Sequence, residues 1–246
     1  SGTHIGTIGN TAYVSGYMIF NIYFALILLL HTPWRWQWPF YLAIILMLVA
    51  FLKANTSGAI IGLSASLLLL LFLMGLCASR RRWRRTALLV FGIALIGVIT
   101  LFSQYKQPWF QENKHLHNLS IYKSTFQTRR LSWEGAARDF YLHPWLGTGF
   151  GNYAIIFDRQ FNPEFFNYST TETYFDRAHN NLIDITSTTG ALGLLAYLSI
   201  FVFAARDWYR SLRRRGGRIK PGAEGRPVRE LLVLAALIAA YFIQNL

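Results

Sequence analysis

Long uninterrupted apolar blocks divide the chain, and they lie at about 11–31, 37–52, 57–77, 86–103, 181–204 and 230–246. A block of roughly 20 apolar residues is long enough to cross a bilayer as an α-helix. The second block is short, and the fourth and fifth are separated by a polar stretch of about 75 residues. The pattern predicts an all-α, polytopic bundle of transmembrane helices with a large, mostly helical loop outside the membrane.

These blocks also predict how the chain is divided. Residues 1–103 hold four transmembrane helices, 104–178 form the loop domain, and 179–246 hold two further helices around a basic loop at 205–229. Residues 1–10 are small and polar without a basic start, so they are not a signal peptide. Because the chain opens in a loop and is still apolar at Leu246, we expect it to be a fragment of a longer protein.

The composition agrees with a membrane protein. Hydrophobic residues make up 53% of the chain and charged residues 14%, whereas a soluble domain carries roughly 25% charge. These values exclude a disordered chain and a collagen-like one. The single cysteine, Cys77, leaves no internal disulfide to form.

The net charge of +13 comes largely from two basic clusters, Arg80–Arg85 and Arg206–Arg229. The excess of Lys and Arg in cytoplasmic loops predicts that both clusters face the cytoplasm. They are separated by an even number of spans, so the loop at 104–178 faces outward. We expect the clusters to set orientation and to touch anionic lipid headgroups. They lack the interleaved aromatic residues of a nucleic-acid surface.

His179 is the strongest candidate for chemistry on the outward face. It lies at the mouth of the fifth span, where an ionisable residue is costly and indicates function. A histidine can act as a general base near neutral pH, and Asp176, Arg177, Asn180 and Asp184 are possible partners. The alternative is an interfacial histidine bonded to a backbone carbonyl.

Two arginines of the loop, Arg129 and Arg177, suit a phosphate ligand. A guanidinium group binds phosphate through two parallel hydrogen bonds. The alternative for both is an ion pair within the loop, to Glu134 or Asp176.

The loop contains recognisable local structure. Residues 134–142 have helical spacing, and an apolar face would hold Leu131, Ala136, Ala137, Phe140 and Tyr141. The helix ends at His143-Pro144, because proline disfavours helix at the residue before it. Residues 147–151 predict a tight bend. They do not predict a dinucleotide-binding turn, because such a turn needs a preceding strand and a six-residue glycine spacing, and the sequence shows neither. The aromatic segment 153–174 predicts a second short helix or a sugar-stacking surface.

No metal site or cofactor is expected. His115 and His117 are spaced so that they could supply two ligands of a metal site, but no carboxylate or cysteine cluster joins them. The chain has no Asp-x-Asp, no P-loop and no Gly-x-Ser-x-Gly.

Several short motifs occur in order along nearly the whole chain. They are Gly6-Thr7-Ile8-Gly9-Asn10, Thr56-Ser57-Gly58-Ala59 with Gly62-Leu63, Arg129-x-x-x-Trp133, His143-Pro144-x-x-Gly147-x-Gly149-x-x-Asn152-Tyr153, and Phe175-Asp176-Arg177-Ala178-His179-Asn180 with Gly190-x-x-Gly193-Leu194. In this set and this order the sequence resembles the O-antigen ligase and O-antigen polymerase-like family. One position departs from the family pattern, because Ser57 stands where the family has an arginine that contacts the lipid pyrophosphate. Lys53, on the same predicted outer face, would replace the lost charge.

The resemblance implies a C-type glycosyltransferase-like fold in the bacterial inner (plasma) membrane, with an active site facing the periplasm. The donor would be a glycan linked to a polyprenyl pyrophosphate such as undecaprenyl pyrophosphate. The acceptor would be a hydroxyl of lipid A-core or a similar glycolipid or glycan, as in lipopolysaccharide biosynthesis. Transfer would invert the anomeric centre without a metal or cofactor. The residues implied are His179 and Arg129 as catalytic, and Arg177, Arg130 and Asn180 as substrate-binding. Lys53 is added to the substrate-binding residues for its charge and its predicted outer face, and not as a family feature.

Other functions remain open from the sequence. A polymerase that extends the lipid-linked glycan uses the same donor and motif order, and a protein acceptor is a third use within the family. A transporter should show mid-span charges and repeated halves, which the sequence lacks. A non-catalytic membrane scaffold would bind the donor with no dependence on Arg129 or Arg177.

Overall fold

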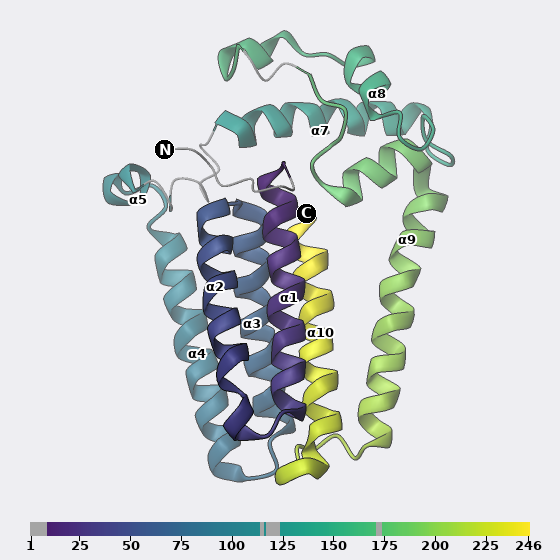
Figure 1. Cartoon of the computed structure of the whole chain (residues 1–246). Helices are drawn as coiled ribbons and strands as arrows, with labels where there is room; N and C mark the ends of the chain where they lie inside the picture. Colours follow the sequence, from purple (N-terminus) through teal and green to yellow (C-terminus); the bar gives the residue numbers. More distant parts are fainter. Residues whose placement is uncertain (1–8, 114–115, 117–123, 171–173) are drawn as a thin grey trace. The chain divides into compact units, whose positions relative to one another are not determined.

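The computed structural model describes residues 9–113, 116, 124–170 and 174–246, and it confirms the all-α fold class (Figure 1). The α-helices are α1 (Thr11–His31), α2 (Trp38–Ala54), α3 (Ser57–Cys77), α4 (Arg81–Ser103), α5 (Pro108–Glu112), α7 (Ser124–Leu142), α8 (Tyr153–Arg159), α9 (Asn181–Arg214) and α10 (Arg226–Gln244). Short 3₁₀ helices are η2 (Trp34–Trp36), η3 (Pro163–Asn167) and η4 (Gly222–Gly225).

The helices are those of a multi-pass membrane protein. Five are long and apolar enough to cross a membrane, namely α1, α3, α4, α9 and the segment Gly222–Gln244. The second predicted span, α2, has only 17 residues and is about 25 Å long, short of the roughly 30 Å hydrocarbon core. Two boundaries differ from the sequence prediction, because α9 continues to Arg214 and α10 already begins at Arg226.

The chain folds into two compact units. Unit 1 comprises Ser1–Gln104 and Ala205–Gln244, and unit 2 comprises Tyr105–Ala204 with Asn245–Leu246. The long helix α9 therefore begins in unit 2 and ends in unit 1.

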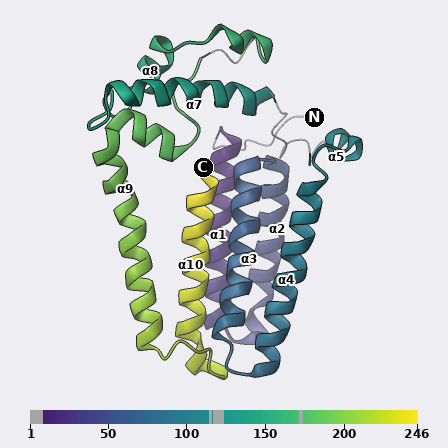
Figure 2. The ribbon, with the colours of Figure 1, turned by 180° about the vertical axis from the view of Figure 1, so that it is seen from behind.

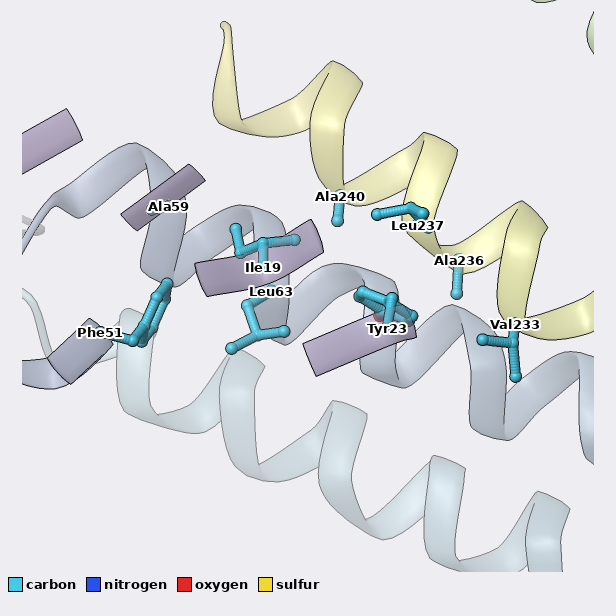
Figure 3. Close-up of a cluster of buried hydrophobic side chains, with 9 residues drawn as sticks. All are labelled: Ile19, Tyr23, Phe51, Ala59, Leu63, Val233, Ala236, Leu237 and Ala240. Carbon is cyan, nitrogen blue, oxygen red and sulfur yellow. The ribbon is translucent and has the colours of Figure 1, made fainter. Parts of the chain in front are cut away.

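Unit 1 is a bundle in which α1, α2, α3, α4 and α10 lie side by side (Figures 1 and 2). Its core draws residues from four helices (Figure 3), and they are Ile19, Tyr23, Phe51, Ala59, Leu63, Val233, Ala236, Leu237 and Ala240. Small residues let α3 and α10 approach closely. A Cβ atom on Gly58 would lie 2.9 Å from the Gln244 carbonyl oxygen, and one on Gly62 would lie 2.9 Å from that of Ala240. Close packing of small residues is how helices associate where lipid removes the hydrophobic drive.

Unit 2 is built on an aromatic core. Buried side chains of α7, α8, η3 and the segment before α9 form one cluster, and they are Leu131, Ala136, Tyr153, Ile156, Phe157, Phe165, Phe175 and Ala178. The rings of Phe157, Phe165 and Phe175 lie 5.2–5.8 Å apart, within the range of favourable aromatic pairs.

The helix predicted over 134–142 begins earlier, at Ser124, and its predicted apolar face is divided. Leu131 and Ala136 are buried in the core, whereas Ala137 and Tyr141 are exposed beside a groove described below. The second short helix predicted within 153–174 is α8, which ends at Arg159.

Candidate active site

His179 lies in a short non-helical segment directly before α9 in unit 2. Its side chain is exposed and its backbone has φ of +53°, a left-handed conformation that is uncommon for residues other than glycine. The Phe175 ring lies 5.5 Å from the imidazole at an angle of 77°. Such a conformation persists only where the surroundings hold it, and it occurs often at functional sites.

Two side chains hold the residue before His179 in place. The Trp133 indole Nε1 donates a hydrogen bond of 2.7 Å to the Ala178 carbonyl oxygen. The Ala178 N–H donates to Asp184 Oδ1 at 3.1 Å. Trp133 is the last residue of the Arg-x-x-x-Trp motif, so two motifs 45 residues apart meet at Ala178.

Asn180 fixes the other side of His179 by capping α9. Its Oδ1 accepts hydrogen bonds from the N–H groups of Leu182 and Ile183 at 3.0 and 3.2 Å. These N–H groups belong to the first turn, which has no partner within the helix. Its Nδ2 donates to the Leu246 carbonyl oxygen at 2.7 Å. Asn180 therefore has a structural role, and its predicted contact with substrate stays a prediction.

The predicted arginines of unit 2 are distributed around this segment. Arg177 pairs with Asp184 at 3.4 Å and is 51% exposed, so its partner is neither Glu134 nor Asp176. Arg130 pairs with Glu134 at 3.7 Å, with both side chains about half exposed. Arg129 lies four residues before Trp133 on α7, which places the two on the same helix face.

A buried ion pair stabilises the turn after α7, and the sequence analysis did not single it out. Asp139 has a fully buried side chain and accepts a 2.8 Å hydrogen bond from Arg159 Nη1. Its other oxygen accepts from the Thr148 hydroxyl. The same Arg159 nitrogen lies 3.3 Å from His143 Nε2. No sequence signal marks this pair, because Arg159 is 20 residues further along the chain.

The glycine-rich segment 147–151 forms the predicted tight bend, and Gly147, Gly149 and Gly151 all have positive φ. It packs against a break in α9 at Gly190, which has φ of +68° and ψ of −169°. A Cβ atom on Gly190 would lie 2.3 Å from the Trp145 carbonyl group, and one on Gly147 would lie 2.4 Å from the Thr188 backbone. Only glycine fits at either contact.

Backbone hydrogen bonds explain why the two segments need each other. On one side of the break, Ser187 and Thr188 carbonyl oxygens accept from the N–H groups of Thr148 and Gly149 at 3.1 and 2.8 Å. On the other side, the Ala191 N–H donates to the Pro144 carbonyl oxygen at 2.8 Å. The segment thus satisfies backbone groups that a broken helix leaves without partners.

An apolar groove of about 280 Å³ lies between α7 and the first part of α9. It is lined by Trp133, Ala136, Ala137, Phe140, Tyr141, Leu182, Ile183, Thr186 and Ser187. Trp133 therefore borders the groove and also bonds to the residue before His179.

Tyr153 is fully buried in the core of unit 2 and bonds to the α7 helix. Its hydroxyl lies 2.7 Å from Ser132 Oγ, and burial raises the pKa of Tyr153 to about 12. The phenol therefore stays protonated at neutral pH and serves as a structural hydrogen-bonding group.

Lys53, the remaining predicted site residue, belongs to unit 1. It is exposed at the C-terminal end of α2, which is capped by the left-handed residue Asn55, and Ser57 begins α3 two residues later.

The predicted motif at 6–10 lies only partly within the described residues, where Asn10 caps α1 by accepting from the Ala12 N–H at 2.8 Å. His115 and His117 lie outside the described residues. The described residues contain no group of three or more His, Cys, Asp or Glu that is placed to hold a metal.

The comparisons with known proteins agree with the motifs. No curated protein matches the chain. The family model described as O-antigen ligase matches residues 42–198, a range that includes Lys53, Arg129, Trp133, Arg177 and His179. This range covers more than half of the chain, and the protein therefore belongs to the O-antigen ligase family.

Proposed function

We propose that this protein is a membrane glycosyltransferase that moves a glycan from a polyprenyl-pyrophosphate carrier to an acceptor hydroxyl, such as one of lipid A-core. One observation carries the proposal beyond the family membership. The hydrogen bond from Trp133 to the Ala178 carbonyl oxygen joins the Arg-x-x-x-Trp motif to the segment that holds His179. A candidate base and candidate phosphate ligands thus belong to one unit.

His179 acts as the general base in this proposal. Its imidazole is exposed, and the residues on both sides of it are fixed by Trp133, Asp184 and the capping side chain of Asn180. A neutral histidine can accept a proton from an attacking hydroxyl near neutral pH. Because its neighbours are fixed, little ordering remains to be done when the acceptor binds.

The reaction is a single displacement. The acceptor oxygen forms a bond to the anomeric carbon, and its proton passes to His179. The bond between that carbon and the pyrophosphate oxygen breaks, and the electron pair leaves with the polyprenyl pyrophosphate. Attack opposite the leaving group inverts the anomeric centre.

Cationic side chains balance the charge that develops on the leaving pyrophosphate. In unit 2 this positive charge comes from Arg129, Arg130 and Arg177, and guanidinium groups suit phosphate oxygens. The ion pairs of Arg130 and Arg177 are long, and both arginine side chains are about half exposed although Asp184 is only 15% exposed. Long pairs with an exposed partner contribute little stability, so either arginine can exchange its carboxylate for a phosphate. Lys53 belongs to unit 1, and its predicted contact with the substrate stays a prediction.

The apolar groove beside Trp133 suits a hydrocarbon chain. Its lining from α7 is mainly apolar and aromatic, and a lipid carrier needs such a surface next to its charged group. We place the isoprenoid or acyl part of a lipid substrate there. The basic clusters at Arg80–Arg85 and Arg206–Arg229 then face the cytoplasm, and the site faces the periplasm of a bacterial inner membrane.

A reconstituted transfer assay with the full chain tests the role of His179. Lipid-linked glycan and lipid A-core are supplied, and product is read as a gel shift. The sharpest variant is His179→Asn, because asparagine tolerates the left-handed backbone but is not a base. The matched control is His143→Asn, since His143 is also an exposed histidine of unit 2.

We expect His179→Asn to abolish transfer, with a loss of about a hundredfold or more, while retention of the lipid-linked donor stays unchanged. His143→Asn should transfer normally. Normal turnover by His179→Asn would refute the role of the base. A wild-type protein that lengthens the donor without using lipid A-core would be a polymerase. The protein would be a scaffold if the wild type transfers no glycan and if Arg129→Gln and Arg177→Gln retain the lipid-linked donor as well as the wild type does.

A further inference from the structure

The end of unit 1 that carries both arginine clusters contains a pocket of about 370 Å³, here named the basic-end pocket. Its walls come from the C-terminal end of α3, the first turns of α4, the loop before η4, and the start of α10. Its lining includes Met74, Ser79, Arg80, Trp83, Lys220 and Arg229.

The loop that closes this pocket is held by specific bonds. The Ile219 N–H donates to the Cys77 carbonyl oxygen at 2.7 Å, and Ser79 Oγ donates to the Ile219 carbonyl oxygen at 2.5 Å. Arg218 Nη1 donates to the Leu76 carbonyl oxygen at 2.8 Å. Three bonds across about 140 residues of sequence therefore shape the pocket without a ligand, so binding costs little ordering.

Part of the pocket lining is cationic. Arg80, Lys220 and Arg229 belong to this part, and no carboxylate is among the lining residues of the pocket. Lys220 pairs with Glu224 at 3.3 Å, but both side chains are largely exposed, and such a pair is weak. The α4 helix begins next to Arg80 without a side-chain cap, so its first N–H groups also favour an anion.

Arg229 gives the most specific indication of a ligand. Its Nη2 donates to the Gly222 carbonyl oxygen at 2.7 Å, which holds the guanidinium in place. Its Nε is buried and lacks a hydrogen-bond partner among the residues that the structure describes, so a small shift of the side chain is needed to bring this atom to a ligand. A buried N–H without an acceptor is costly and rare in folded proteins. A phosphate oxygen that enters the pocket is an acceptor of the right charge and favours that shift.

Another part of the lining is apolar. Met74, Trp83 and Ala87 belong to this part, at the end of two helices that are long enough to span a membrane. Tryptophan is enriched at the level of lipid headgroups. A ligand that contacts both sets of residues carries a phosphate next to hydrocarbon, which is the chemistry of a phospholipid.

We propose that the basic-end pocket binds the phosphate of one anionic phospholipid, with Arg229 and Arg80 on the phosphate oxygens and Met74 and Trp83 against the glycerol and acyl groups. A soluble phosphate shares the polar contacts but makes no contact with the apolar residues. This site is independent of the glycan transfer proposed above and is built wholly from unit 1.

Native mass spectrometry of the full chain in detergent tests the proposal. The protein is titrated with palmitoyl-oleoyl phosphatidylglycerol, with phosphatidylcholine of the same chains, and with inorganic phosphate. The variants are Arg229→Gln and Arg80→Gln. The matched control is Arg85→Gln, which removes the same charge five residues further along the chain, in the first turns of α4, and does not line the pocket.

We expect one tightly retained phosphatidylglycerol in the wild type. Its Kd should rise roughly tenfold in Arg229→Gln and in Arg80→Gln, the loss of one charge-assisted hydrogen bond, and less than about twofold in Arg85→Gln. If Arg229→Gln does not fold by circular dichroism, Arg80→Gln carries the test, because Arg80 is exposed.

Three results would overturn the proposal. Equal retention of phosphatidylcholine would exclude a site for anionic lipid. An equal loss in Arg85→Gln would mean that diffuse charge, and not this pocket, holds the lipid. Displacement of phosphatidylglycerol by micromolar inorganic phosphate would identify a soluble phosphate as the ligand and exclude the lipid.

Discussion

The two units are stabilised by different means. In unit 1, α3 and α10 pack through small residues, and Gly58 and Gly62 lie directly against the backbone of α10. In unit 2, the backbone leaves the helix at Gly190, and a glycine-rich loop supplies the missing hydrogen bonds. A buried carboxylate, Asp139, then holds that loop through Thr148 and Arg159.

This difference shows where the protein can place irregular backbone. Helices that cross a membrane must satisfy their polar groups internally, and those of unit 1 do so as unbroken, closely packed helices. In unit 2, α9 is also long and apolar enough to cross a membrane, but it is broken at Gly190, and residues 144–149 satisfy the backbone groups that the break exposes. The stability of unit 2 and its site therefore depend on the same contacts, and substitutions can test that dependence.

The largest effect is expected from Gly190→Ala. The new Cβ would overlap the Trp145 carbonyl group, and the backbone conformation is one that only glycine adopts readily. We expect a loss of about 3 kcal/mol or more, measured by thermal unfolding of the full chain in detergent. Gly151→Ala is the control, since it also has positive φ but no atom within 4 Å. Equal losses in both variants would show that backbone strain alone, and not the contact with Trp145, sets the cost.

Asp139→Asn should have the next largest effect. It leaves Arg159 facing a neutral partner at a buried site, and breaking such a pair costs about 3 kcal/mol when both groups are buried. Because Arg159 is 42% exposed, we expect about 2 kcal/mol from denaturant unfolding. The control Glu134→Gln breaks the exposed pair with Arg130 and should cost less than about 0.5 kcal/mol. A larger loss in the control would contradict the distinction between the two pairs.

Gly62→Val tests the packing of unit 1. The side chain would push α3 away from Ala240, and overpacking of this kind costs about 1–3 kcal/mol. Thermal unfolding of Gly62→Val should therefore begin at a lower temperature than that of the wild type. Gly92→Val in α4 meets nothing within 4 Å and should have little effect. Similar melting of the two variants would mean that the close approach of α3 and α10 is not needed.

The smallest effect on stability is expected from Trp133→Phe, which removes only the hydrogen bond to Ala178. We expect about 1 kcal/mol in unfolding but a loss of at least about tenfold in glycan transfer, because His179 is then positioned less well. The readout is transfer rate beside melting temperature. Trp145→Phe, at an exposed tryptophan of the same unit, is the control. Transfer that falls only in proportion to stability would assign Trp133 a purely structural role.

The sequence predicted most of the membrane helices but not the break in α9. Apolar length alone is enough for α1, α3, α4 and α10, because a bilayer imposes a minimum length on any helix that crosses it. Gly190 lies within an apolar run and could equally have continued the helix. Only the contact with Trp145 and the bonds from residues 144–149 make the broken conformation favourable.

For the candidate site, the sequence marked the residues but not their connections. It singled out His179, Arg129 and Arg177, and it suggested Asp176 or Glu134 as the partner of Arg177. The structure instead pairs Arg177 with Asp184 and holds the segment through Trp133. It also brings Asp139 and Arg159 together, which no local pattern indicates.

By itself, then, the sequence determined the helical class, most of the membrane-spanning helices and the motifs that place this chain in its family. These depend on local composition and spacing, which a membrane and a helical period constrain strongly. The tertiary structure decided how His179 is held, where α9 breaks and which charges are paired. Each of these depends on a hydrogen bond or a contact between distant residues, and its strength is set by distance and angle, which the order of residues alone does not give.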